Sequence, residues 1–166
     1  NNYAEEDSNI DILENLNTIK KQSLIAVPIS NPFIPDKKVV FNSPTTRIEH
    51  SDNFSIDYGY QILDGARVME IGIQDFNGTE NLAMYVLEKE GKILVYDGER
   101  TNTIYRYINQ SKGHSLRLEL LKGDAFFYLD NREIHRVRRV GIYSGDFFLG
   151  SRNTYSEIGN VQFNIG

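Results

Sequence analysis

The feature that most constrains this chain is a long succession of short, β-prone segments that begins near residue 39 and runs to the C-terminus. The segments are rich in β-branched and aromatic residues, and several alternate apolar with polar side chains, as strands with one buried face do. Between them stand the glycine, asparagine and aspartate residues that tight turns require, as in "LDG" (63–65), "KEG" (89–91) and "YSG" (143–145). With no helical pattern among these segments, the succession predicts an antiparallel sandwich or barrel.

Alternation also predicts which side chains fill the core. In "GNVQFNI" (159–165), alternation places Val161, Phe163 and Ile165 on one face, so this last strand should close the sandwich beside an early strand. The predicted core positions are Phe54, Ile56, Ile71, Leu118, Leu120, Phe127, Leu129, Phe148, Val161 and Phe163.

The first residues follow a different pattern. Residues 7–21 carry apolar side chains near the spacing of one helical face, which predicts a short helix that docks on the domain or ends an upstream stalk. Prolines punctuate residues 23–44 and indicate an extended, wrapping segment. We therefore expect an N-terminal helix or connector over residues 1–22 and a single β-sandwich domain over residues 23–166.

Charge and composition exclude several classes of protein. The net charge of −5 argues against nonspecific binding to nucleic acid, and no apolar run approaches the ~18 residues that a membrane helix needs. The chain has no cysteine, which excludes disulfides and thiolate metal sites. It opens on "NNYAEEDSN" without a methionine, so we expect a processed product or a piece of a larger protein.

The C-terminal half carries a resemblance to a known fold. "LRLELLKGDAFFYLDNREI" (116–134) resembles the strand, turn and strand of concanavalin A-like and laminin G-like sandwiches. "DFFLGS" (146–151) with "IGNVQFNI" (158–165) is similar to their closing strands, and "FSIDYGYQI" (54–62) to an early one. The resemblance implies an all-β, antiparallel jelly-roll sandwich that is commonly extracellular and commonly binds carbohydrate. With the N-terminal helix, this is the fold that we expect.

Catalytic chemistry finds little support in the sequence. A glycoside hydrolase needs two carboxylates that flank the scissile bond, two or four residues apart if they share a strand. Glu88 and Glu90 have this spacing but abut a turn, where solvated carboxylates are expected. His50, His114 and His135 lack the nearby partner that zinc sites usually show. We therefore favour a protein that is not an enzyme.

A tyrosine-rich hairpin is the first candidate ligand site. Sugars bind to aromatic faces and to polar groups that contact their hydroxyls. The segment "VYDGERTNTIYRY" (95–107) offers both, in the candidate ligand-binding residues Tyr96, Asp97, Arg100, Asn102, Tyr105 and Tyr107. The alternative is that these tyrosines are half-buried structural residues.

A basic segment, "EIHRVRRV" (133–140), is the second candidate site. Its strand should stop near Val137, with the last arginines in a loop. An anionic glycan would contact guanidinium groups through paired hydrogen bonds, and the candidate residues are Arg132, His135, Arg136, Arg138 and Arg139. The alternative is a solvated edge strand whose positive charge prevents edge-to-edge pairing.

Calcium is a further candidate ligand. Sandwiches of this kind often hold Ca²⁺ through oxygen atoms of loop residues. Such oxygens occur in Asp97, Glu99, Asp130, Asn131 and Asp146. The alternative role of these side chains is turn formation.

These observations favour a noncatalytic carbohydrate-recognition module of a secreted or surface protein, bacterial or viral, whose partner is a glycan or glycoprotein. The main alternative is a structural or protein-interaction domain of the same fold, such as an adhesin, fibre or assembly component, which contacts other domains or copies of itself. A glycan hydrolase or lyase is the second alternative.

Overall fold

The computed structural model describes residues 22–25, 37–138 and 140–165, and every regular element in these ranges is a β-strand. The predicted helix near residues 7–21 lies outside the described residues. The strands are β1 (Gln22–Ile25), β2 (Lys37–Phe41), β3 (Ile48–Ser51), β4 (Asn53–Gln74), β5 (Glu80–Leu87), β6 (Lys92–Tyr96), β7 (Thr101–Tyr105), β8 (His114–Leu121), β9 (Asp124–Leu129), β10 (Arg132–Val137) and β11 (Tyr143–Ile165).

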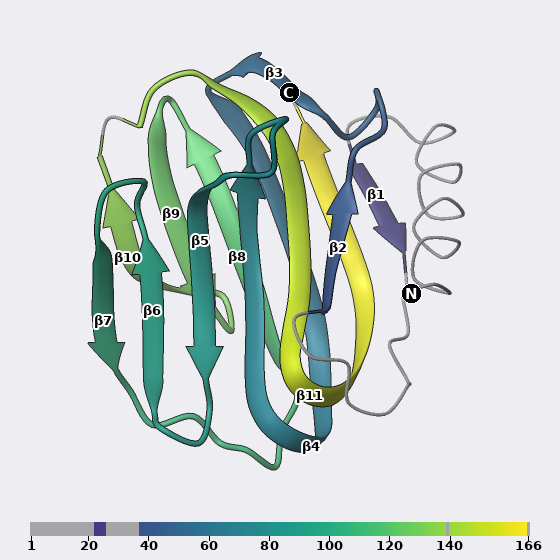
Figure 1. The fold of residues 1–166 in the computed structure, drawn as a ribbon, viewed down its shortest axis with the longest axis vertical. Coiled ribbons are helices and arrows are strands. Elements are labelled where there is room, and N and C mark those ends of the chain that lie inside the picture. Colours follow the sequence, from purple (N-terminus) through teal and green to yellow (C-terminus); the bar gives the residue numbers. More distant parts are fainter. Residues whose placement is uncertain (1–21, 26–36, 139, 166) are drawn as a thin grey trace.

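The strands form two layers that share two long strands, β4 and β11. The first half of β4 pairs with β8, its second half pairs with β5, and β11 pairs with β4 along nearly its whole length. One layer, here the β8 layer, has the order β10-β9-β8-β4-β11-β1, and the other, the β5 layer, has the order β7-β6-β5-β4-β11-β2. All these pairings are antiparallel, and β3 adds to the start of β11. Figure 1 shows both long strands curving back at the same end of the molecule.

Local backbone geometry explains the bend. Gly65 and Arg67 in β4 have φ of 107° and 62°, and Asn153 in β11 has φ of 46°, all in the left-handed region. The ladder between the two strands shifts register at the same place, and the Thr154 hydroxyl accepts a hydrogen bond from the Val68 amide at 2.9 Å. The segment "LDG" (63–65) therefore does not separate two strands, as the sequence predicted, but lies within β4, whereas "YSG" (143–145) forms the first residues of β11. The result is a single sheet folded over itself rather than two separate sheets.

The core lies between the two layers. All ten side chains predicted to fill it are buried, and nine of them belong to this core. Phe148 is buried on the other face of β11, where Lys38 Nζ lies 4.2 Å from the centre of its ring. Phe163 packs edge-on against Phe41 and Phe147, with ring centroids 4.8 and 5.6 Å apart. Phe163 also pairs with Ile56 of β4, so the last strand closes the sandwich beside an early strand, as predicted.

Candidate functional site

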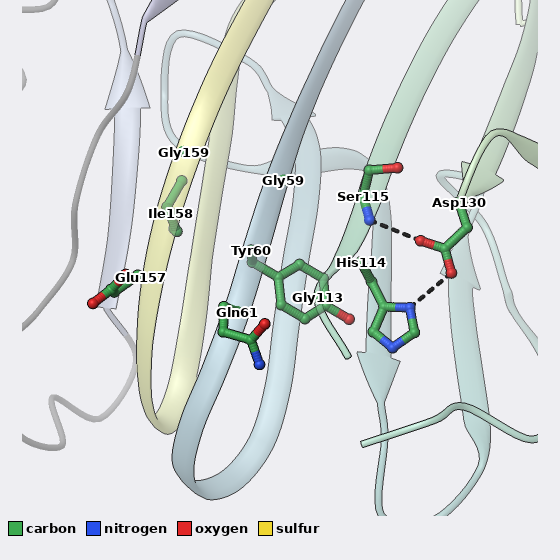
Figure 2. Close-up of a pocket in the computed structure, with 10 residues that line it drawn as sticks. All are labelled: Gly59, Tyr60, Gln61, Gly113, His114, Ser115, Asp130, Glu157, Ile158 and Gly159. Atoms are coloured by element: carbon green, nitrogen blue, oxygen red, sulfur yellow. Dashed lines mark hydrogen bonds and ion pairs between the residues drawn. The ribbon is translucent and has the colours of Figure 1, made fainter. Parts of the chain in front are cut away.

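Two adjoining hollows lie near the bent end of the β8 layer, and Figure 2 shows the larger of the two. It has a volume of about 660 Å³ and is bordered by β4, β8 and β11. Gly59 and Gly159 face each other across β4 and β11, and an added Cβ on Gly159 would meet no atom within 4 Å. Because both residues lack side chains, the surface is open there. Polar groups of Gln61, Ser115 and Glu157 surround the opening.

A smaller pocket of about 380 Å³ lies beside the first. Its wall comes from the connection between β7 and β8 and from the turn between β9 and β10. Arg106, Lys112 and Arg132 line it, together with Tyr107, whose side chain is 85% exposed. His114 and Asp130 line both pockets, so these two residues form a ridge between them.

The hydrogen bonds of His114 favour its protonated form. Its Nδ1 lies 2.7 Å from Asp130 Oδ2, and its Nε2 lies 2.7 Å from the carbonyl oxygen of Asn109. Both partners are acceptors when Asp130 is ionised, so the arrangement favours a proton on both ring nitrogens, which is the cationic form of the ring. Burial opposes this charge, but the hydrogen bonds to Asn109 and Asp130 and the charges of Asp130 and Glu88 outweigh it and raise the pKa of His114.

Behind the ridge, Glu88 is the centre of a buried network. Its side chain is fully buried, and its Oε1 accepts from Arg67 Nε at 3.0 Å. Its Oε2 accepts from the Tyr60 hydroxyl at 2.8 Å and lies 3.9 Å from His114 Nε2. Burial, and then the charge of Glu88, raise the pKa of Tyr60, so its hydroxyl remains a donor. The carboxylate is thus paired with the Arg67 guanidinium, accepts a hydrogen bond from the Tyr60 hydroxyl and lies close to the His114 ring.

The same cations hold the connection between β7 and β8. Arg67 donates to the carbonyl of Gln110, and His114 donates to that of Asn109. At its start the connection is tied to the β5–β6 turn, since the Arg106 amide donates to Gly91 O at 2.9 Å. Ile108 anchors its middle in the core. The wall of the smaller pocket is therefore a fixed surface.

The structure divides the tyrosine-rich candidate site. Residues 96–102 lie at the β6–β7 turn, where Asp97 Oδ1 accepts from the amides of Glu99 and Arg100, both at 2.9 Å. These two hydrogen bonds, that from Arg100 foremost, lower the pKa of Asp97. Tyr105 and Tyr107 are at the other end of β7 and strongly exposed. Tyr107 alone of the predicted tyrosines lines a pocket described above.

The basic candidate site is also divided. Arg132 lies at the smaller pocket, whereas Arg136 lies further along β10, bound to Glu133 at 2.9 Å and stacked 4.6 Å over the Phe126 ring. His135 faces the ring of Phe127, with centroids 6.4 Å apart. β10 ends at Val137, as predicted, and Arg138 is exposed beyond it. Arg139 lies outside the described residues.

Two central residues were not predicted as site residues. The expectation that Glu88 is a solvated turn carboxylate is wrong, because its side chain is buried and paired with Arg67, whereas Glu90 is exposed. His114 had a detectable signal, since it continues the inward-facing alternation of Leu116, Leu118 and Leu120. A polar residue in such a row needs buried partners.

The candidate calcium ligands do not form one group of side chains that could bind the same ion. Asp130 binds His114 and the Ser115 amide, Asp97 caps its own turn, and Asp146 accepts from Arg47 Nε at 3.1 Å. Within the described ranges, no three side chains of the His, Asp or Glu type are grouped as a metal site would require. No helix in these ranges is long and apolar enough to cross a membrane.

Comparison with known proteins identifies the fold. No family model and no curated protein matches the sequence. Among solved structures, carbohydrate-binding module CBM66 from Bacillus subtilis matches with a TM-score of 0.58 and 15% identity, over 86% of this chain and 95% of that one. Galectin LEC-6 from Caenorhabditis elegans matches with a TM-score of 0.55 and 8% identity, over 88% of this chain and 97% of that one. A tetrameric galectin from the sponge Cinachyrella sp. matches with a TM-score of 0.57 and 6% identity, over 71% of this chain and 96% of that one.

The fold that this chain shares with these structures is the jelly-roll sandwich of the concanavalin A-like type. The resemblance stated from the sequence is therefore confirmed at the level of the fold. Identities this low carry no ligand from one protein to another.

Proposed function

We propose that this domain is a noncatalytic carbohydrate-recognition module and that the glycan binds at the bent end of the β8 layer, across the His114–Asp130 ridge. The observation that carries the proposal is the pair of adjoining pockets that share these two residues. The structural neighbours support it, since they are a carbohydrate-binding module and galectins.

The chemistry of the larger hollow suits a sugar. Gln61 offers both amide donors and an acceptor, Ser115 offers a hydroxyl, and Glu157 is an exposed acceptor. The opening left by Gly59 and Gly159 gives a flat ring access to the backbone of the sheet. Tyr107 adds an exposed aromatic face at the other side of the ridge, of the kind that packs on the apolar face of a pyranose.

The noncatalytic part of the proposal rests on the state of the carboxylates. Hydrolysis of a glycosidic bond requires two carboxylic groups that can both reach the substrate. Asp130 already binds His114 and the Ser115 amide, and Glu88 is fully buried among Arg67, Tyr60 and His114. Both carboxylates therefore already bind neighbouring groups of the protein that hold the ridge in place. We also propose a secreted or surface location, where glycans are displayed; fractionation of the native cell would test it.

A glycan array followed by calorimetry tests the proposal. Gly159→Phe would fill the hollow without a steric clash of its Cβ, so we expect it to abolish binding and leave the melting temperature nearly unchanged. Asn164→Phe is the matched control, since it places the same ring at an exposed position further along β11. A folded Gly159→Phe variant that binds as tightly as the wild type would place the ligand elsewhere. An array on which no glycan binds would refute the function itself.

A structural or protein-interaction domain is the second candidate, and one observation favours it. Leu121, the last residue of β8, and Ile142, just before β11, are 42% and 68% exposed, and the nearby Gly141 amide donates to the Gly123 carbonyl at 3.0 Å. Exposed apolar groups of this kind occur at contact surfaces. Sedimentation at several concentrations tests this role: concentration-dependent association that Ile142→Ser abolishes would support it, and a monomer throughout would contradict self-assembly.

A further inference from the structure

We propose that the smaller pocket is a subsite for an anionic group of the glycan, a carboxylate or a sulfate ester. This inference rests on the proposed function and adds to it a ligand class and an orientation: the charged group binds among Arg106, Lys112 and Arg132, and the neutral part lies across the ridge in the larger hollow.

The charge balance of the pocket is the first argument. Arg106, Lys112 and Arg132 are three cations on its wall. The one carboxylate there, Asp130, has both oxygens occupied, since Oδ2 binds the His114 imidazolium at 2.7 Å and Oδ1 accepts from the Ser115 amide at 3.0 Å. The Asp130 and His114 charges compensate each other, so the three basic side chains set the sign of the pocket. This positive region occurs on a chain whose net charge is −5.

The contrast with the larger hollow is the second argument. The charged residues on that side of the ridge are His114, Asp130 and Glu157, so once the ridge pair has cancelled, the remaining charge is negative. An anionic group would be repelled by Glu157 and attracted into the smaller pocket. The two sides of the ridge therefore differ in sign, and this difference would orient a sugar that carries one acidic substituent.

Rigidity of the wall is the third argument. The connection that bears Arg106, Tyr107 and Lys112 is held at its start by the Arg106–Gly91 hydrogen bond and in its middle by buried Ile108 and by the His114–Asn109 hydrogen bond. Less conformational entropy is lost when a ligand binds to a surface that is already fixed. The Tyr107 ring stands beside these cations, so an anionic sugar would find a charge partner and an aromatic face together.

A charge-matched pair of double variants tests the inference. Lys112→Gln/Arg132→Gln removes two positive charges from the pocket, and Arg136→Gln/Arg138→Gln removes two from β10 and the residue beyond it, outside the pocket. All four side chains are exposed, so both variants should keep the wild-type melting temperature. The probes are an array that presents each glycan core in neutral, sulfated and sialylated form, followed by calorimetry of the best matched set.

We expect the wild type to prefer the anionic forms of a core by roughly tenfold or more, as charge-assisted hydrogen bonds would give. The pocket variant should lose this preference and still bind the neutral core, whereas the β10 variant should retain it. The preference should also weaken as salt rises, while binding of the neutral core should not. Comparison of the sulfated with the sialylated forms then identifies which anion the pocket takes.

Three outcomes would overturn the inference. Equal binding of neutral and anionic forms, or equal loss of preference in both variants, would show that the pocket does not select charge. In either case the neutral core still binds and remains sensitive to Gly159→Phe, so the proposed function would stand without the anion subsite. Failure of all glycans, neutral forms included, would refute both.

Discussion

Arg67 and Glu88 form an ion pair at 2.9 Å in which the carboxylate is fully buried and the guanidinium is 11% exposed. Removing one partner of such a pair leaves an uncompensated charge in the interior, which usually costs several kcal/mol. Here the effect would spread, because Glu88 also accepts from Tyr60 and Arg67 also holds the connection between β7 and β8.

We therefore predict that Glu88→Gln lowers the free energy of unfolding by about 3 kcal/mol, measured by urea denaturation. Glu90→Gln is the control, since it makes the same chemical change at an exposed position two residues away and should cost no more than about 0.5 kcal/mol. Equal and small effects of the two variants would show that the network adds nothing to stability.

A second prediction concerns pH. The pKa of His114 is raised in the folded protein above its ordinary value of 6.5, against the effect of burial, by its bonds to Asn109 and Asp130 and by the charges of Asp130 and Glu88. A group whose folded pKa is raised stabilises the fold fully below its unfolded pKa, and this contribution is lost as pH rises through the folded pKa. Stability should therefore decline as pH increases from about 6.5.

The measurement is a series of denaturation curves between mildly acidic and alkaline pH. His114→Gln should lower stability at acidic pH and remove much of the decline above pH about 6.5, whereas His50→Gln, at an exposed position, should leave the profile as in the wild type. A wild-type stability that rises with pH over this interval would contradict a charged His114.

A third prediction concerns the aromatic core. Phe163→Ala removes a ring that packs on Phe41 and Phe147 and is 2% exposed, so it should cost about 3–5 kcal/mol. Phe76→Ala is the matched control, because that ring is 50% exposed and its centre lies 4.7 Å from Arg47 Cζ. This variant should lose less than about 1 kcal/mol of unfolding free energy. Calorimetric melting of the two variants would separate them, and a Phe163 variant with wild-type stability would contradict the closing role of β11.

A fourth prediction concerns calcium. Asp97, Asp130 and Asp146 each accept hydrogen bonds from neighbouring groups, so we expect that neither added Ca²⁺ nor a chelator changes the melting temperature or the glycan affinity. Differential scanning fluorimetry with millimolar Ca²⁺, and with Mg²⁺ for comparison, provides the measurement. A rise in melting temperature specific to Ca²⁺ would establish a calcium site and require one of these carboxylates to change partners.

The sequence predicted which strand faces are buried better than it predicted where each strand begins and ends. Period-two alternation identifies Phe127 and Phe163 as core residues because burial of a strand face is a local pattern. The sequence does not reveal the bend of β4, because "LDG" has the composition of a hairpin turn, and only the pairing of β4 with β11 on both sides shows that the strand continues. Local composition does not distinguish a bend within a strand from a turn between two.

The candidate site was predicted in fragments for a related reason. Tyr107 and Arg132 were chosen from separate segments, and the structure brings them to one pocket because β7 and β10 lie at the same edge of the two layers, visible together in Figure 1. Glu88 and His114 lie behind these two residues. His114 is a polar side chain in a row of apolar neighbours, and Glu88 is a carboxylate at a turn. Their partners come from distant strands, which a single sequence does not reveal.

The passage of β4 and β11 through both layers has a consequence for folding kinetics. Val68 and Thr154 meet at the bend although 86 residues separate them, so neither layer can be completed until this distant pairing has formed. Closing so long a loop is slow, and folds dominated by such contacts refold on the slower end of the range for small domains. Since β4 and β11 belong to both layers, a ligand that binds only the folded protein at the bend would stabilise both layers together.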